Sequence, residues 1–202
     1  MPKIVDHDER REHIVTALYE LLAREGFGQL NMREIAREAG YSHGAIARYF
    51  PNKQAVLKAT FSRMIESWQE QFQHATTDLS GLQGLEALCR RLWPLGEIGR
   101  GNANVVVALW NEAITDDELH TIQRENNSLT RSRIRQFLLE AQRKEEVSRD
   151  LDVDATVRSI MVRSMGWQML AVLVSGEATD DVLNADIQAL VAGLQASAYT
   201  QI

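Results

Sequence analysis

The chain has 202 residues, 45% hydrophobic and 25% charged, and a formal net charge of −6, which is ordinary for a globular protein and excludes a fibrous or disordered chain. Its single cysteine, Cys89, excludes an intramolecular disulfide framework. No apolar run approaches the roughly 18 residues of a membrane-spanning helix, and the charged N-terminus is not followed by the apolar stretch of a signal peptide. We therefore expect a cytoplasmic protein.

The charge is unevenly distributed along the chain. Residues 1–63 contain ten Lys+Arg and eight Asp+Glu, a net +2, whereas residues 64–202 contain twelve and twenty, a net −8. A mildly basic first part on an acidic remainder is expected when only the first part approaches phosphates. A solvated surface without electrostatic purpose is the alternative interpretation.

The first helix is expected from Asp8 to Glu25, after a loose arm over residues 1–7. Apolar residues recur at helical spacing within it, and Gly26 ends it. The apolar stripe consists of Ile14, Ala17, Leu18, Leu21 and Leu22. We expect this helix to pack across the segment that follows.

Two short helices joined by a glycine turn are predicted in the run NMREIAREAGYSHGAIARYFPNK. Asn31 is a good N-cap, and Glu34 stands three residues later, the spacing of a capping box. Gly40 can take the left-handed conformation that ends a helix, and Ser42 caps a second helix expected to reach about Tyr49. This arrangement is a helix-turn-helix, whose second helix enters the major groove of DNA.

The second helix of this motif offers the candidate DNA contacts. Ile46 and Phe50 have the spacing of inward anchors, which leaves polar and small side chains facing outward. The candidate DNA-binding residues are Asn31, Arg33, Ser42, His43, Gly44, Ala45, Arg48, Tyr49 and Lys53. His43 and Arg48 are candidates for base edges, and Lys53 for phosphate. Short helix pairs also occur in proteins that never touch DNA, so the pattern alone leaves both interpretations open.

The residues of this run resemble the DNA-binding head of the TetR family of bacterial transcriptional regulators. The family's typical pattern is matched in register at Ile35-Ala36, Ala39-Gly40, Ser42, Gly44, Tyr49-Phe50 and Lys53. The chain departs from the pattern at Asn31, Tyr41 and Ala47, where the family favours Thr, Val and an aromatic residue. The resemblance implies a DNA-binding regulator with a helical, dimerising body.

A long helix is expected from Asn52 or Lys53 to about Ala75, because no Gly or Pro interrupts the run. Its apolar face consists of Leu57, Phe61, Met64, Trp68 and Phe72. The start of this helix adjoins the motif, so its N–H groups and Lys53 can hold a phosphate. The helix would act as a lever between the body of the protein and the DNA-binding motif.

The remaining chain is predicted to be helical, which makes the protein all-α, with a three-helix head, the long helix and a helical body, about nine helices in total. Further helices are expected at Leu82–Leu92, Ala103–Ile114, from Thr115 or Asp116 to Lys144 or Glu145, at Val153–Val174, and from Thr179 or Asp180 to Tyr199. The run GEIGRGN, residues 96–102, is interpreted as a connection. The predicted domains are a DNA-binding head over residues 1–51 and a ligand-binding and dimerisation domain over residues 52–202.

The last two predicted helices are the candidates for a subunit interface, because they carry more apolar surface than one core needs. The candidate residues are Ile160, Leu170, Leu173, Val174, Leu183, Ile187, Leu190, Val191 and Leu194. Two such helices from each subunit would close a four-helix bundle in a homodimer. A monomer that buries these faces internally is the alternative.

Three tryptophans on different predicted helices suggest a ligand pocket in the body. The candidate residues are Trp93, Trp110, Asn111, Glu112, Met161, Met165, Trp167 and Gln168. Aromatic faces attract quaternary ammonium groups by about 0.5–2 kcal/mol per ring, and Glu112 would add a complementary charge, so a choline-like cation fits. An apolar ligand such as a fatty acid or a drug-like aromatic also fits, and tryptophans that only fill the core are the third possibility.

The segments PKIVDHDERR, ALWNEAITDDELHTIQRENN and LLEAQRKEEVSRDLDVDATVRSIM resemble the branch of TetR regulators that includes the choline-responsive repressor BetI. The resemblance implies a repressor that binds a palindromic double-stranded operator as a homodimer and is released by a small molecule, without identifying that molecule. A helical scaffold or activator, and a DNA-binding regulator without an effector, are the alternatives.

No enzymatic chemistry is predicted. The five histidines show no metal-ligand spacing, and no serine or cysteine lies in a nucleophile motif, so we name no catalytic residue, cofactor or metal site. His120, Asp116 and Asp117 have a spacing that suits a metal, but a capped first helical turn explains the same residues.

Overall fold

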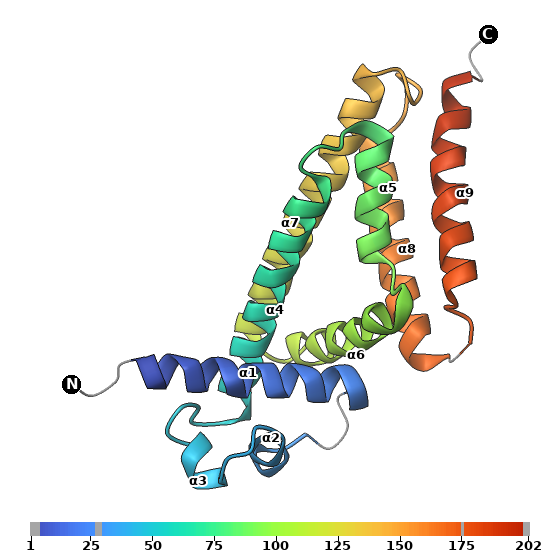
Figure 1. Ribbon diagram of the computed structural model, residues 1–202. Helices are drawn as coiled ribbons and strands as arrows, with labels where there is room; N and C mark the ends of the chain where they lie inside the picture. The colour runs from blue at the N-terminus through green and yellow to red at the C-terminus, as the bar shows by residue number, and fades with distance from the viewer. Residues whose placement is uncertain (1–4, 27–29, 175, 200–202) are drawn as a thin grey trace.

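The computed structural model describes residues 5–26, 30–174 and 176–199, and every regular element within these ranges is an α-helix (Figure 1). The helices are α1 (Val5–Glu25), α2 (Met32–Glu38), α3 (His43–Ile46), α4 (Lys53–Thr76), α5 (Gly81–Leu92), α6 (Gly96–Ala113), α7 (Asp117–Arg143), α8 (Val153–Leu173) and α9 (Asp180–Tyr199). The predicted all-α fold is confirmed. Within the described ranges, no helix has both the length and the apolarity that a membrane crossing requires.

The predicted N-terminal arm is only partly open to comparison. Residues 1–4 lie outside the described residues, and residues 5–7, predicted as loose, already belong to α1. The helix extends to this point because no proline or glycine interrupts the run VDHDE.

Helices α1, α2 and α3 form a head at one end of the molecule (Figure 1). The Asn31 side chain accepts hydrogen bonds from the backbone N–H groups of Arg33 and Glu34, and the Glu34 carboxylate accepts one from the Asn31 N–H. The predicted capping box is therefore present at the start of α2. Gly40 has a φ of 70°, which is the left-handed conformation predicted for it.

The second helix of the motif is shorter than predicted. α3 is helical only from His43 to Ile46, and a turn replaces the expected helix up to Tyr49. In that turn the Arg48 and Tyr49 N–H groups donate to the carbonyls three residues before them, at 3.2 and 2.8 Å. The Phe50 N–H still donates to the Ile46 carbonyl at 3.0 Å, and Pro51, which lacks an N–H, ends the segment.

α4 is the long helix predicted after the motif, and it leads from the head into the body (Figure 1). The Asn52 side chain caps it by accepting a hydrogen bond from the Ala55 N–H at 2.9 Å. Of the predicted face, Leu57, Phe61, Met64 and Phe72 are buried and Trp68 is half-buried. One continuous helix therefore has one end beside α3 and the other within the body.

α6 overturns the prediction that residues 96–102 form a connection, since this run is the first part of a helix. Glycine in a helix is unfavourable by about 1 kcal/mol relative to alanine. Here the glycines allow close packing: a Cβ on Gly99 would lie 2.7 Å from the Pro94 carbonyl carbon, and one on Gly101 would touch Ala23 of α1. Packing of α6 along α1 therefore outweighs the local propensity (Figure 1).

The described residues form two apolar clusters. The first joins the head to the start of α4, to α6 and to the start of α7, and includes Leu18, Ile46 and Leu109. The second holds the remainder of the body around α5, α7, α8 and α9, and includes Leu85 and Ile160. Because α6 shares a cluster with the head, a movement of α6 changes the packing of the head. The domain division at residue 51 stays a prediction.

Candidate DNA-binding head and ligand cavity

The surface of the head around α3 carries most of the predicted DNA contacts. Ile46 and Phe50, the predicted inward anchors, are 0% and 1% exposed and hold this segment on the head. The exposed candidates are Asn31, Arg33, Ser42, His43, Gly44 and Arg48. The α3 segment therefore has polar side chains on its solvent-facing side and buried apolar anchors on the other side.

Asn31 and two half-buried DNA-binding candidates make contacts within the chain. Asn31 is the N-cap described above, and Ala45 is half-buried. Tyr49 is half-buried as well: its hydroxyl accepts a hydrogen bond from Arg10 at 3.2 Å, and its carbonyl accepts one from Arg11 at 2.6 Å. Side chains of α1 therefore fix the end of the α3 segment, a role that the spacing of the motif did not indicate.

Lys53, the predicted phosphate ligand, lies at the start of α4. Its Nζ is 4.0 Å from Oε1 of Glu112 near the end of α6, and the two side chains are 25% and 13% exposed. Glu112 was predicted to line the ligand pocket, and it instead connects α6 to the start of α4, next to the head. Asn111 is exposed and also lies outside the pocket. The neighbours of Trp110 in sequence were misplaced because adjacent residues of a helix point in different directions.

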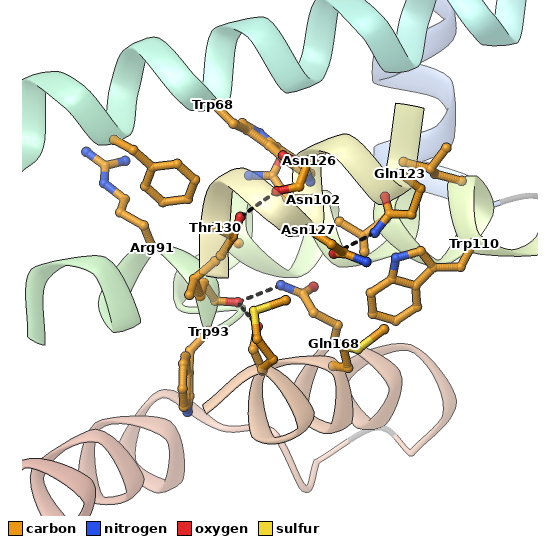
Figure 2. A pocket seen from close by; sticks show the side chains of 18 of the residues that line it. Trp68, Arg91, Trp93, Asn102, Trp110, Gln123, Asn126, Asn127, Thr130 and Gln168 are labelled. Atoms are coloured by element: carbon orange, nitrogen blue, oxygen red, sulfur yellow. Dashed lines mark hydrogen bonds between the residues drawn. The ribbon is translucent and has the colours of Figure 1, made fainter. Parts of the chain in front are cut away.

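A cavity of about 120 Å³, which we call the body cavity, lies among α4, α5, α6, α7 and α8 (Figure 2). Five of the predicted pocket residues line it: Trp93, Trp110, Met161, Met165 and Gln168. Trp167 does not, because its indole N–H donates to Asp186 of α9 at 2.8 Å. Five of the eight predicted pocket residues therefore meet at one cavity, and their role in binding a ligand stays a prediction.

Sequence reasoning missed the polar half of the body cavity. α7 contributes four polar side chains at helical spacing, and α4 and α6 contribute one more each. These residues are Gln123, Asn126, Asn127 and Thr130 of α7, Gln71 of α4 and Asn102 of α6. Uncharged amide side chains along one face of α7 could have indicated this wall in the sequence, because a helix face that points to solvent usually carries charged residues.

Hydrogen bonds fix most of the polar atoms of this wall. Gln123 donates to the Asn127 carbonyl oxygen at 3.1 Å, and Gln168 Nε2 donates to the Leu92 carbonyl at 2.7 Å (Figure 2). Two atoms of the lining, Trp110 Nε1 and Gln168 Oε1, are buried without a hydrogen-bond partner among the described residues. The body cavity therefore offers one unused donor and one unused acceptor.

A second cavity, of about 270 Å³, lies between α1, α4 and α6 and shares Trp68, Gln71 and Asn102 with the body cavity. It is bordered by Tyr19 of α1, whose hydroxyl donates to Asn102 Oδ1. Burial raises the pKa of Tyr19, so this hydroxyl keeps its proton at neutral pH. Asn102 therefore borders both cavities and also contacts the head.

The predicted interface residues divide into two groups. Four are 0 to 8% exposed because they already pack in the chain's own core, so a partner subunit cannot cover them: Ile160, Leu183, Ile187 and Leu194. The other five remain at least partly accessible: Leu170, Leu173, Val174, Leu190 and Val191. α8 also presents an exposed apolar stripe at helical spacing, formed by Val162, Met165, Met169 and Leu173.

Comparison with curated proteins finds transcriptional regulators. The chain is 26% identical over 130 residues to the HTH-type transcriptional regulator BetI of Pseudomonas fluorescens, which covers 63% of this chain and 66% of that protein. It is 30% identical over 92 residues to the HTH-type transcriptional regulator HbdR of an Aromatoleum species, which covers 46% and 38%. The matches thus span about two thirds or less of these relatives.

Solved structures of regulators share the fold. A transcriptional regulator from Saccharomonospora viridis, solved in complex with choline, has a TM-score of 0.84 and 19% identity, covering 92% of this chain and 96% of that one. A transcriptional regulator from Rhodococcus sp. Rha1 has a TM-score of 0.80 and 18% identity, covering 91% and 95%. At these identities the likeness establishes the fold alone.

Two family profiles match the chain. The profile described as bacterial regulatory proteins, tetR family, matches residues 14–60, which contain the helix-turn-helix. The profile described as BetI-type transcriptional repressor, C-terminal, matches residues 82–196, more than half of the chain. The chain therefore belongs to the TetR family of bacterial transcriptional regulators, with a C-terminal domain of the BetI type.

Proposed function

We propose that this protein is a repressor that binds a palindromic operator as a homodimer and leaves it when a small molecule enters the body cavity. One observation carries the proposal: α6 lines the body cavity with Asn102 and Trp110, and the same helix contacts Tyr19 of the head and Lys53 at the start of α4. Because the target is chromosomal DNA, we place the protein in the cytoplasm.

The exposed edge of α3 supports the DNA part of the proposal. In a dimer, two such segments must enter successive major grooves, with centres roughly 34–36 Å apart. An effector that favours another separation of the heads lowers operator affinity by linkage, without competing for the DNA site. Coupling of this kind is typically about 1–3 kcal/mol, or roughly 5- to 150-fold in affinity.

The contacts of α6 supply a route for this coupling. Glu112 follows Trp110 by two residues, so a ligand that displaces Trp110 also moves the carboxylate paired with Lys53. The Tyr19–Asn102 hydrogen bond gives α1 a second connection to the cavity wall. A carboxylate near Lys53 also competes with DNA phosphate for the ammonium group. Movement of α6 therefore alters both the position and the ion pairing of Lys53, the residue predicted to contact DNA phosphate.

The apolar stripe of α8 supports the dimer. Val162 and Leu173 are 68% and 69% exposed, and they stand on the same face of α8 as Met165 and Met169. Exposed apolar residues aligned along one helix are typical of an interface that a second copy covers. The structurally similar regulator from Saccharomonospora viridis, solved in complex with choline, supports a small-molecule effector.

Mutations of the head test the DNA contacts. In anisotropy titrations against operator fragments selected from the native genome, we expect Lys53→Ala to weaken all sequences alike and to reduce the slope of log affinity against log salt by about 1. We expect His43→Ala and Arg48→Ala to relax sequence preference, by about 1–3 kcal/mol at the contacted base pair.

Glu112→Gln is the matched control, because it removes the charge opposite Lys53 and leaves Lys53 in place. We expect this variant to bind the operator at least as tightly as the wild type. An unchanged affinity and salt slope in folded Lys53→Ala would rule out the phosphate role.

A further inference from the structure

The charges around the body cavity restrict the chemistry of its ligand. Among the described residues that line it, none is Asp or Glu, and the one charged side chain is the exposed Arg91. Glu112 pairs with Lys53 elsewhere, so it offers no charge to the cavity. The neighbours of a cation in this site would be the faces of aromatic rings and the positively charged guanidinium group of Arg91. Ring faces alone offset only part of the cost of removing a cation from water, and Arg91 repels it.

The two unpaired atoms of the lining indicate which groups the ligand carries. Buried donors and acceptors in folded proteins are nearly always paired, so Trp110 Nε1–H and Gln168 Oε1 are exceptions that a ligand would explain. The Gln168 amide cannot simply be reversed, because its Nε2 donates to the Leu92 carbonyl at 2.7 Å and a carbonyl only accepts. The ligand must therefore accept from Trp110 and donate to Gln168.

The size and the remaining lining indicate a small ligand with an apolar part. The cavity of about 120 Å³ is smaller than the roughly 300–1,000 Å³ of pockets for drug-sized molecules. Aromatic rings and thioethers form its apolar wall: Trp68, Phe72, Trp93, Trp110, Met161 and Met165. Such a wall binds a compact hydrocarbon group by excluding water from it.

We propose that the effector is a small uncharged molecule with an apolar body and a group that both accepts and donates a hydrogen bond, as an alcohol does. The inference rests on the proposed function, because it takes the body cavity as the effector site. A hydroxyl group supplies both the acceptor for Trp110 and the donor for Gln168. It adds no charge to a cavity that holds no carboxylate to neutralise a cation.

A matched pair of ligands tests the charge directly. Choline and 3,3-dimethylbutan-1-ol have the same shape and hydroxyl group, but choline has a positively charged quaternary nitrogen where the alcohol has a carbon. A third ligand, 3,3-dimethylbutanoate, supplies the anion that Arg91 would favour. Each is titrated calorimetrically into the full-length protein without DNA, up to about 10 mM, and we expect the alcohol to bind at least about tenfold more tightly than either ion. Tighter binding of choline or of the butanoate, or no heat from any of the three, overturns the proposal.

Three substitutions locate the binding. Trp110→Phe keeps the ring and removes the donor, so the alcohol should bind about threefold to tenfold more weakly. Asn127→Asp keeps the acceptor for Gln123 and adds a carboxylate to the wall, so the preference should shift towards choline. Trp167→Phe is the control, since this tryptophan lies outside the cavity and its loss should leave the affinity unchanged. An unchanged affinity for the alcohol in folded Trp110→Phe contradicts the assignment.

Operator release is measured separately, by anisotropy of labelled operator. Release by the alcohol at concentrations that saturate the protein supports both proposals. Binding of the alcohol without release would overturn the gating in the proposed function and leave the ligand class standing. Release by choline alone would overturn the ligand class and leave the repressor standing.

Discussion

Asp116 connects the start of α7 to α4 through one side chain. Its carboxylate accepts hydrogen bonds from the Glu118 and Leu119 N–H groups at 3.0 and 3.1 Å, and its other oxygen lies 3.4 Å from Lys58. The hydrogen bond from Leu119 and the charge of Lys58 lower the pKa of Asp116 below its ordinary value. The ionised form is therefore favoured in the folded protein.

The sign of this pKa change predicts a pH dependence of stability. Because the folded-state pKa of Asp116 is depressed, its contribution to the free energy of unfolding is complete above the unfolded-state pKa of about 3.9. This contribution is lost as the pH falls through the folded-state pKa. Asp116→Asn keeps a good N-cap that does not titrate. We expect the free energy of unfolding, measured in urea from pH 7 to pH 3, to fall less steeply below about pH 4 in this variant.

Asp117→Asn is the control for this comparison, because it removes a charge from the same helical turn and leaves the Asp116 contacts in place. If Asp116→Asn follows the wild-type profile at every pH, Asp116 does not contribute through its ionisation.

Among the contacts of α9 with the body, one carboxylate binds two different elements at once. Asp186 Oδ2 accepts hydrogen bonds at 2.8 Å from the indole N–H groups of both Trp93, between α5 and α6, and Trp167 of α8. Its other oxygen is 3.5 Å from Arg163. Trp93 is 1% exposed, so its N–H has no access to water if the carboxylate is lost. Three elements therefore depend on one acceptor.

Two substitutions of Asp186 separate the hydrogen bonds from the charge. Asp186→Ala leaves a buried indole N–H unpaired and should lower the free energy of unfolding by roughly 2–4 kcal/mol. Asp186→Asn retains one carbonyl acceptor for the indoles and should cost only about 1 kcal/mol. Denaturant titration followed by tryptophan fluorescence measures both. Equal losses in the two variants would show that Asp186 stabilises the fold through its charge and not through the indole hydrogen bonds.

At the scale of the whole molecule, the exposed stripe of α8 decides which mutations report on dimerisation. Leu194 is 8% exposed in the chain itself, so a charge there would disrupt the fold before it reached an interface. Leu173 is 69% exposed, and its replacement leaves the core of the subunit intact. A charge at Leu173 therefore tests association without testing folding.

We expect Leu173→Glu to sediment as a folded monomer that has lost operator binding. Burying an unpaired carboxylate costs roughly 3–5 kcal/mol, which raises the dissociation constant of the dimer more than about a hundredfold. Leu139→Glu, on the exposed side of α7, is the control and should remain dimeric. A monomeric wild type, or a Leu173→Glu variant that still forms dimers, would exclude the α8 face as the interface.

Features that depend on neighbouring residues were predictable from the sequence alone. The capping box at Asn31 and the left-handed Gly40 were predicted, because each depends on contacts within one turn of the chain. The starts of α4 and α7 were predicted to within one residue for the same reason. The long, uninterrupted apolar face of α4 was predictable for the same reason. These local signals were sufficient for the all-α fold and for the family resemblance that the profiles confirm.

Only the tertiary structure decided which face of each body helix is used, because that depends on residues distant in the chain. α6 begins at Gly96 because its glycines pack against Pro94 and against α1, an advantage invisible to local propensity. Glu112 pairs with Lys53, 59 positions earlier, and Trp167 bonds Asp186 instead of facing the cavity. Periodicity shows that a helix has an apolar face, but the partner of that face, whether core, cavity or second subunit, is set by packing.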